Sequence, residues 1–549
     1  MPKIPFWIFA ILAVLYLSAV RVDVMDIDAS QYAEMSREML QRHDYLHLYD
    51  HGVDYLDKPP FLFWISSLSM QLFGINNLGY KLPSVLFALL ALFATYRLAR
   101  LLYDEATGRV AALILGVCQG VFLMTNDVRT DTILMGWVAT ALWCIKECEL
   151  RRTWYYMLGG CLALACGLMT KGPIALFVPL FAFGSDWVLK RKWKKLFSPW
   201  HLADMSIVLI LLIPMSIGLY QQFDQHPEKW IDGKQGTSGL KFFFWSQSFG
   251  RITGENTWDN GADISFLLLN MLWSFLPWIF LLLAAVFVNT RQLIRQRFRL
   301  TETQEWVSTG GFILSYLSLG LSHYQLPHYI FVAFPLASIM VAGLLRQFWT
   351  DNAFQRLHRA FSGIQAGISG LLLVGVLLIL LFVFPAGWIG ITLWILAVTL
   401  WLLLLRQYKN TRVLWSSSIA MILINIFLTH HFYYQLLKYQ AGSVVGKYLR
   451  ELKIDREQFQ SADINDPLSA LDFYAGDTMR RMNHIQAATK SGEYILTSDS
   501  GLVKLAMLHK PYTILKRGRY FKVSELTPEF LNYKTRDKAT TPYYVLRVQ

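Results

Sequence analysis

Residues 364–405 decide the fold, and they read IQAGISGLLLVGVLLILLFVFPAGWIGITLWILAVTLWLLLL. The runs Ile364–Phe384 and Trp388–Leu405 are each long enough to cross about 30 Å of hydrocarbon as a helix. A helix satisfies its own backbone polar groups, which lipid cannot do. The stretch therefore predicts an α-helical membrane protein that crosses the bilayer several times.

Composition extends this prediction to most of the chain. The 549 residues are 54% hydrophobic and only 16% charged, and the mean hydropathy is +0.35, which excludes a large soluble enzyme. Apolar periodicity predicts about 13 spans. They lie near residues 5–22, 78–97, 109–125, 131–147, 155–171, 173–189, 204–222, 264–287, 307–322, 328–346, 362–384, 387–405 and 413–432.

The hydropathy falls from Ala441 onward, and the last part of the chain has a different pattern. Residues 494–497, 512–515 and 543–546 have the composition of strands, and residues 443–452 and 499–508 that of helices. We therefore expect two domains. Residues 1–440 would form the transmembrane domain, and residues 441–549 a small soluble α/β domain.

The net charge of +13 follows the predicted topology rather than a nucleic-acid surface. Lysine and arginine gather in short connections that share one side of the membrane if the spans alternate, which makes that side cytoplasmic. The N-terminus is then cytoplasmic, and the loops 23–77 and 223–263 and the domain 441–549 are external. In a bacterial envelope this means the inner membrane, with the domain 441–549 in the periplasm. All five cysteines fall in or beside apolar spans and are expected to be buried apolar residues.

Carboxylates follow the first span in the stretch Asp26–Glu34. Charge close to a bilayer is costly, so such a cluster is by default a functional-site hypothesis. Asp28 fits a general base toward an acceptor hydroxyl. It equally fits the N-cap of an amphipathic helix over residues 29–42 at the membrane interface, with Gln31 completing a capping box. Asp26 is expected to be structural. The apolar segment Phe61–Phe73 is predicted to be a second helix, too short to span.

Cations stand near these carboxylates in the sequence. Lys58 precedes two prolines, which favour an extended backbone at Lys58. It suits either a lipid phosphate or an anchoring role at the interface. Lys171, between two spans, suits the same two roles, and the anchoring role is favoured. Arg251 suits a second phosphate ligand or an anchor, and Arg129 with Asp131 suits either a ligand contact or a simple ion pair.

Two further stretches of the sequence contain histidines. His323, Tyr324 and His328 fit an aromatic belt or hydrogen bonds to a sugar or phosphate. The spacing of His43, His47 and His51 would place them on one helical face as a metal site. Asp44, Asp50 and Gly52 disfavour a helix there, so we expect no metal at these histidines. No Walker A, Rossmann, HExxH or GxSxG motif occurs in a sequence context that would support its function.

The stretch Asp28–Glu34 and, after a gap, Tyr55–Trp64 together resemble the first external loop of a known family. This family is the GT-C glycosyltransferases of the protein O-mannosyltransferase superfamily, and in particular the bacterial aminoarabinose transferases that modify lipid A. The resemblance extends through Arg129–Asp131, Arg251 and residues 323–335 and to the 13-span layout with an external C-terminal domain.

The resemblance implies a GT-C fold and transfer of a sugar, with inversion, from a polyprenyl-phosphate carrier to an acceptor at the outer leaflet. Asp28 matches the catalytic aspartate, Lys58 the lysine that holds the lipid-linked phosphate, and Arg251 is expected to assist it. We expect the substrate cavity to include Tyr55, Asp57, Gln31, Arg129, Asp131, His323, Tyr324 and His328.

Three residues depart from the family pattern. Ala29 stands where a glutamate usually follows the aspartate, Gln31 replaces an arginine, and Asp57 replaces a glutamate. These changes leave the base and the phosphate ligand in place but leave the donor sugar and the acceptor open.

The expected partners are a polyprenyl-phosphate-linked sugar, a lipid, glycan or protein acceptor and membrane lipids, but not nucleic acid. The protein is expected to be a monomer, without a cofactor, and a divalent metal remains open. The alternatives are a transporter or flippase of lipid-linked sugars and a non-catalytic assembly role.

Overall fold

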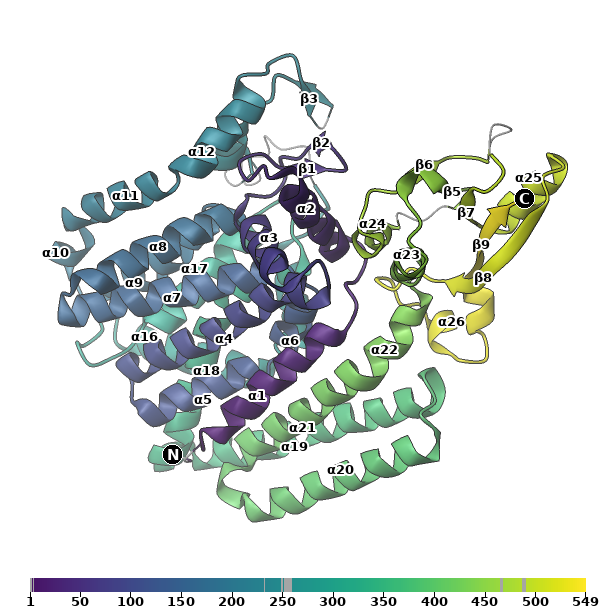
Figure 1. Ribbon diagram of the computed structural model, residues 1–549. Coiled ribbons are helices and arrows are strands. Elements are labelled where there is room, and N and C mark those ends of the chain that lie inside the picture. The colour runs from purple at the N-terminus through teal and green to yellow at the C-terminus, as the bar shows by residue number, and fades with distance from the viewer. Residues whose placement is uncertain are drawn as a thin grey trace.

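The computed structural model describes residues 2, 4–231, 233–247, 250, 259–464, 468–485 and 490–549. Helices form a large body, and a smaller C-terminal region with a sheet lies beside one end of it (Figure 1). Short two-stranded hairpins accompany the helices, β1 (Tyr49–Asp50) with β2 (Val53–Asp54) and β3 (Trp230–Ile231) with β4 (Lys234–Gln235). The chain is therefore mostly helical, as predicted.

A helix or helix pair occupies each of the predicted spans. The helices of the body are α1 (Trp7–Ser18), α2 (Asp28–Arg42), α3 (Phe61–Phe73), α4 (Asn77–Leu102), α5 (Glu105–Gly116), α6 (Gln119–Asn126), α7 (Thr130–Arg151), α8 (Trp154–Lys171), α9 (Ile174–Leu189), α10 (Trp193–Leu196), α11 (Trp200–Leu211), α12 (Ile213–Leu219), α13 (Gly239–Lys241), α15 (Ile264–Ser274), α16 (Ile279–Arg295), α17 (Val307–Gly320), α18 (Phe334–Thr350), α19 (Gln355–Leu378), α20 (Gly387–Gln407), α21 (Arg412–Phe427) and α22 (Tyr433–Leu436). Within the described residues, five helices are long and apolar enough to cross a membrane, or seven if each of two bent pairs counts as one span. The chain is a multi-pass membrane protein, and the number 13 stays a prediction.

Among the described residues, two predicted spans are helix pairs that meet at a sharp bend. The segment Glu105–Gly116 meets Gln119–Asn126 at 55°, and Trp193–Leu211 meets Ile213–Asp224 at 48°. Pro214 lies in the first turn of α12, where its missing N–H removes a backbone bond to the preceding helix. Hydropathy alone does not reveal such bends, because an apolar bend and an apolar straight helix have the same composition.

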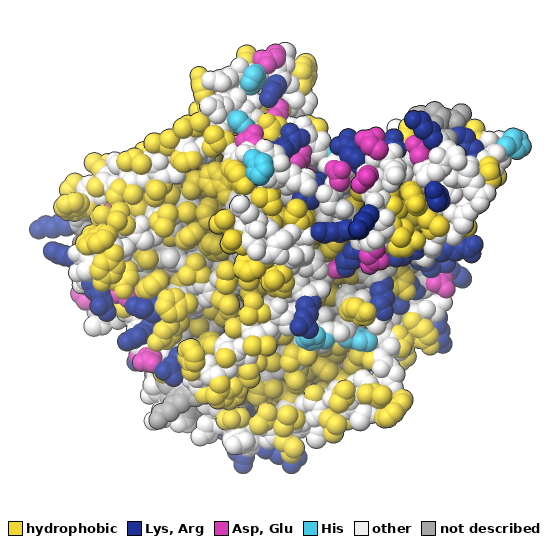
Figure 2. Space-filling model, in the orientation of Figure 1, with side chains coloured by type: hydrophobic (Ala, Val, Ile, Leu, Met, Phe, Trp, Pro, Cys, Tyr) yellow, Lys and Arg dark blue, Asp and Glu magenta, His cyan; other side chains and the backbone are white. Residues whose placement is uncertain are grey.

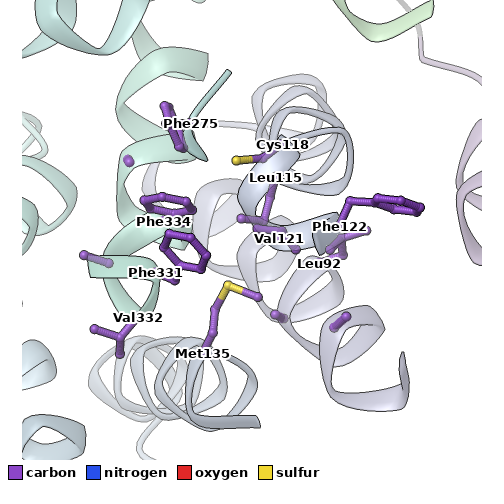
Figure 3. Close-up of a cluster of buried hydrophobic side chains, with 14 of the residues drawn as sticks. Leu92, Leu115, Cys118, Val121, Phe122, Met135, Phe275, Phe331, Val332 and Phe334 are labelled. Atoms are coloured by element: carbon purple, nitrogen blue, oxygen red, sulfur yellow. The ribbon is translucent and has the colours of Figure 1, made fainter. Parts of the chain in front are cut away.

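The centre of the body is a buried cluster drawn in Figure 3, in which aromatic rings of α15–α18 meet aliphatic side chains of α4–α7. The rings of Phe331 and Phe334 stack with centroids 4.6 Å apart, and Phe275 packs edge-on against Phe334 at 4.9 Å. Helices approach closely here, since a Cβ on Gly120 would lie 2.7 Å from the carbonyl oxygen of Ser274. Small residues at such crossings are typical of helix packing in membranes.

The C-terminal region, residues 441–549, contains a five-stranded sheet of order β6-β5-β7-β9-β8. β5 pairs in parallel with β6 and β7, whereas β9 pairs antiparallel with β7 and β8. Its elements are α23 (Ala441–Glu451), β5 (Phe459–Ala462), α24 (Ser469–Ala475), β6 (Arg480–Met482), β7 (Tyr494–Thr497), α25 (Asp499–Met507), β8 (Tyr512–Tyr520), α26 (Pro528–Leu531) and β9 (Thr541–Val548). The predicted strands and helices of this region are present, and β5 and β6 were missed.

Candidate active site

One cavity contains most of the charged side chains singled out from the sequence. It encloses about 1100 Å³ of empty space, including its mouth. Its walls come from the start of α2, the turn before α3, the starts of α7 and α9, the end of α17 and the turn Pro327–Ala333. Its charged lining residues are Asp28, Lys58, Arg129, Asp131 and Lys171, and His328 and Gln247 also reach it.

Asp28 is the first residue of α2, and its carboxylate contacts the guanidinium of Arg129. Ile27 occupies the N-cap position, and no side chain caps this helix. Gln31 donates instead to Asp50, with Nε2 2.7 Å from Oδ2. The capping-box interpretation of Asp28 and Gln31 was therefore wrong, because both side chains make tertiary contacts.

Arg129 lies in the turn between α6 and α7 and holds two carboxylates. Besides Asp28, its Nε donates to Asp127 Oδ2 at 2.9 Å. Burial alone would lower the pKa of Arg129, but the charges of Asp127 and Asp28 raise it. A permanently charged guanidinium at this place fixes the direction of the Asp28 carboxylate.

Lys58 lines the cavity from the turn that precedes α3 and contacts the carboxylate of Asp57. The side-chain amide of Gln247 donates to the backbone carbonyl of Asp57. The loop between α12 and α15 is thus connected to the Asp57–Lys58 turn, although the two lie far apart in the sequence.

Lys171 is a third cation of the cavity, which the sequence interpretation treated as an anchor. Its Nζ lies 2.5 Å from Oδ1 of Asp131, which is 1% exposed, and 4.2 Å from the ring centroid of Tyr329. His328 Nε2 lies 3.6 Å from the other oxygen of Asp131. Gly172 at φ 84° ends α8 directly after the lysine. The anchoring interpretation was wrong because the side chain turns toward Asp131.

The charges that line the cavity are unequal. Lys58, Arg129 and Lys171 are cationic, whereas only Asp28 and Asp131 are anionic. Asp57 and Asp127 lie just behind the lining and contact Lys58 and Arg129. The cavity thus brings three cationic side chains together, and each of them can bind an anionic group such as a phosphate.

The other predicted site residues lie elsewhere. Tyr55 is partly buried and packs edge-on against Phe63, with centroids 6.4 Å apart. The carbonyl of His323 accepts the backbone N–H of Asn260 at 3.4 Å. Among the described residues, the cavity lining includes none of Gln31, Tyr55, Asp57, His323 and Tyr324. Arg251 lies outside the described residues.

Other parts of the chain cover both sides of α2. It packs between α3 and α24, and Glu34 and Arg37, which are 0% and 1% exposed, form a buried ion pair. Arg37 Nη1 also donates to the carbonyl of Gly476 at 3.0 Å. The C-terminal region thus covers the polar face of this helix, and the interfacial position stays a prediction.

The histidine trio does not share a helical face. α2 ends at Arg42, and His43 and His51 both have a positive φ. His47 pairs with Asp44 at 2.8 Å, whereas His51 turns away toward the C-terminal region. The helical arrangement considered for these histidines is therefore absent.

His51 belongs to a charged junction between the loop that joins α1 to α4 and the C-terminal region. Its Nδ1 lies 2.6 Å from Asp50 and its Nε2 2.7 Å from Asp472, which is fully buried. Hydrogen bonds with Asp472 and Asp50 raise the pKa of His51 to about 10, so that it is protonated at neutral pH. Arg481 also contacts Asp472, with Nη1 2.9 Å away.

One atom each from Glu34, His51 and Asp472 lies within 4.8 Å of the others, a spacing that a metal ion could use. Arg37 already donates to Glu34, with Nε 2.7 Å from Oε2, and Arg481 pairs with Asp472. Three acids in the junction, counting Asp50, are thus matched by three cations. These contacts fit a charge-balanced structural junction better than a metal site.

Comparison with known proteins agrees with this architecture. Residues 57–217 match the family model described as dolichyl-phosphate-mannose-protein mannosyltransferase. The undecaprenyl phosphate-alpha-4-amino-4-deoxy-L-arabinose arabinosyl transferase of Edwardsiella ictaluri is 28% identical over 352 residues, which are 63% of this chain and 59% of that protein. The Serratia proteamaculans protein of the same name is 27% identical over 411 residues, which are 72% of this chain and 69% of that protein. The alignments with the first three relatives span between 54% and 62% of their lengths.

The crystal structure of ArnT from Cupriavidus metallidurans bound to undecaprenyl phosphate superposes with a TM-score of 0.70. The superposition covers 98% of both chains at 16% identity, and the apo structure of that protein gives 0.69. The two proteins thus share their fold along nearly the whole chain. Residues 57–217 thus match the dolichyl-phosphate-mannose-protein mannosyltransferase family model, and the whole chain has the fold of ArnT and sequence similarity to bacterial aminoarabinose transferases.

Proposed function

We propose that the protein is an inverting glycosyltransferase that moves a sugar from a polyprenyl-phosphate donor to an envelope acceptor. The observation that carries this proposal is the cavity in which Asp28 lies together with Lys58, Arg129 and Lys171. The relatives are named for an undecaprenyl-phosphate-linked aminoarabinose, which supports the donor class. Lipid A or lipopolysaccharide, another glycan or a protein would be the acceptor.

The cavity residues suit both parts of the donor, the carrier phosphate and the sugar. Lys58 would bind the carrier phosphate, assisted by Lys171 and, from the second external loop, Arg251. These cations would stabilise the negative charge that develops on the phosphate as it leaves. Asp28, oriented by Arg129, would face the sugar. It would remove the proton of a hydroxyl acceptor, whereas with a phosphate acceptor it would orient or stabilise the sugar.

The proposal includes a topology. About 13 spans would place the N-terminus in the cytoplasm and the active site and the domain 441–549 on the periplasmic side of the inner membrane. Transport of lipid-linked sugars is the weaker alternative. A transporter tends to carry ionisable groups near the bilayer midplane, whereas the charges here gather in one cavity beside α2.

The proposal is tested by transfer of label from a polyprenyl-phosphate sugar pool to acceptors in membrane vesicles. We expect Asp28→Asn to lower transfer about a hundredfold or more. Asp455→Asn, the same change at an exposed position of the C-terminal region, serves as the matched control. Wild-type transfer by a folded Asp28→Asn protein would remove Asp28 from the mechanism.

A further inference from the structure

A second hollow lies between α9 and α17, away from the candidate active site. It contains about 920 Å³ of empty space and is almost wholly apolar. Leu180, Val188 and Leu314 line it and are 51%, 41% and 37% exposed, so the hollow opens outward as a groove. A Cβ added to Gly184, which also lines it, would meet no atom within 4 Å. The groove thus has room for an aliphatic chain.

A basic segment closes one end of this groove. Leu189 and Leu196 both line it, and residues 190–195 between them carry five cations. Three of these already have an acidic partner, as Lys190 pairs with Asp186, Lys192 with Glu302 and Lys195 with Glu149. Figure 2 shows lysine and arginine side chains gathered beside a hydrophobic surface at the α10 end of the body.

Arg191 and Lys194 differ from these three lysines. Both are exposed, and neither has an ion pair with any acid among the residues that the structure describes. The turn that follows α16 lies alongside, since Leu300 N donates to the carbonyl of Leu189 at 3.3 Å, and this turn adds Arg297 and Arg299. The end of the groove therefore has uncompensated positive charge.

Exposed aromatic side chains place the same segment at the edge of the membrane. Trp193, Phe197 and Trp200 are 50%, 77% and 72% exposed. Aromatic residues of this kind gather at membrane interfaces, where one end of the ring is apolar and the other is wet. Basic pockets between helices at such an interface bind anionic lipid headgroups.

We propose that the groove between α9 and α17 binds an anionic phospholipid, with an acyl chain along the groove and the phosphate at Arg191 and Lys194. This lipid lies at the opposite end of α9 from the candidate active site. Ile174 and Phe177 line the charged cavity at the start of the helix, whereas Leu189 borders the groove at its end. A helix of 16 residues is about 24 Å long, so the lipid belongs to the other leaflet.

The same two helices line both sites. Ser318, Leu319 and Ser322 line the cavity near the end of α17, and Trp306, Gly310 and Leu314 line the groove nearer its start. A lipid bound between α9 and α17 would therefore contact the two helices that form one wall of the cavity. This proposal does not depend on the sugar-transfer proposal.

The test is a titration of the full-length protein in nonionic detergent with phosphatidylglycerol or phosphatidylcholine, followed by native mass spectrometry. We expect the wild type to prefer phosphatidylglycerol. The double variant Arg191→Gln/Lys194→Gln should bind it roughly thirtyfold more weakly, since each interfacial cation contributes about a factor of five. Arg356→Gln/Arg359→Gln, two exposed arginines on α19, is the matched charge control and should bind as wild type.

A second pair of variants tests the groove itself. Gly184→Leu should displace both phospholipids, because the new side chain fills the empty space. Gly367→Leu, at another open position on α19, should not. Equal binding of the two lipids, or wild-type affinity in the double variant, would overturn the proposal. Displacement of phosphatidylglycerol by polyprenyl phosphate would also overturn it, since the occupant would then be the carrier.

Discussion

Replacing Asp472 by asparagine should loosen the C-terminal region from α2. Asp472 is fully buried and contacts His51 across the junction and Arg481 within the C-terminal region. Asparagine has nearly the same shape and can still accept the backbone N–H of Met479, which now donates to Asp472 at 2.9 Å. The substitution therefore removes a fully buried charge and leaves His51 and Arg481, which are 28% and 34% exposed, without it. Because these cations are partly solvated, the loss of the charged hydrogen bonds costs about 1.5 kcal/mol.

Hydrogen–deuterium exchange of the full-length protein in nanodiscs measures this loosening directly. A loss of about 1.5 kcal/mol corresponds to roughly tenfold faster exchange, after correction for the intrinsic rate, in residues 469–482 and in α2. Asp455→Asn, at an exposed site of the same region, should leave both rates unchanged. Wild-type exchange in Asp472→Asn would refute the view that the junction holds the two parts together.

The same junction should respond to alkaline pH. The pKa of His51 is raised from 6.5 to about 10 in the folded protein. Its protonated form therefore contributes to docking fully below pH 6.5, and this contribution is lost as the pH rises through 10. We expect protection of residues 469–482 to fall between pH 7 and 10 in wild type but much less in His51→Gln. An equal decline in both proteins would assign the pH effect to another group.

Three further changes separate the roles of the cavity residues. Lys58→Ala should weaken binding of polyprenyl phosphate about tenfold or more, since a charged hydrogen bond contributes about 1.5–3 kcal/mol. The loss should exceed that in Asp28→Asn. Calorimetric titration measures both affinities, and wild-type affinity in both variants would contradict the prediction. Lys171→Gln should lower both carrier affinity and the melting temperature, because it leaves the buried carboxylate of Asp131 without its nearest cation; an unchanged melting temperature would argue against this pairing. Arg129→Gln should reduce turnover more than carrier affinity, because Arg129 orients Asp28; a loss of affinity alone would count against that role.

The membrane body could be predicted because apolar runs leave few structural alternatives. The bend between α5 and α6 could not, since it changes the backbone direction without changing the composition. β5 was missed for a related reason. All four of its residues, Phe459–Ala462, are buried in the middle of the sheet, so the strand lacks the alternation of a half-exposed strand.

The candidate site was only partly visible in the sequence. Asp28 and Lys58 stood out because charge is unusual beside an apolar span. Lys171 did not, since a lysine at the end of a span is most often an anchor. Its contact with Asp131 depends on how α7 and α8 pack, which local sequence does not specify. The burial of Arg37 is equally non-local, because the carbonyl that it contacts belongs to Gly476.

The junction at α2 also constrains recombination between relatives. The loop between α1 and α4 contributes Glu34 and Asp50 together with Arg37 and protonated His51, and the C-terminal region contributes Asp472 and Arg481. Each half is neutral by itself, and the ion pair of His51 with Asp472 joins the two halves. A chimera that takes residues 441–549 from a homologue without an acid at the position of Asp472 would leave His51 with one acidic partner in the junction instead of two. Segments 28–54 and 468–482 should therefore be inherited, and exchanged in engineered hybrids, as a single unit.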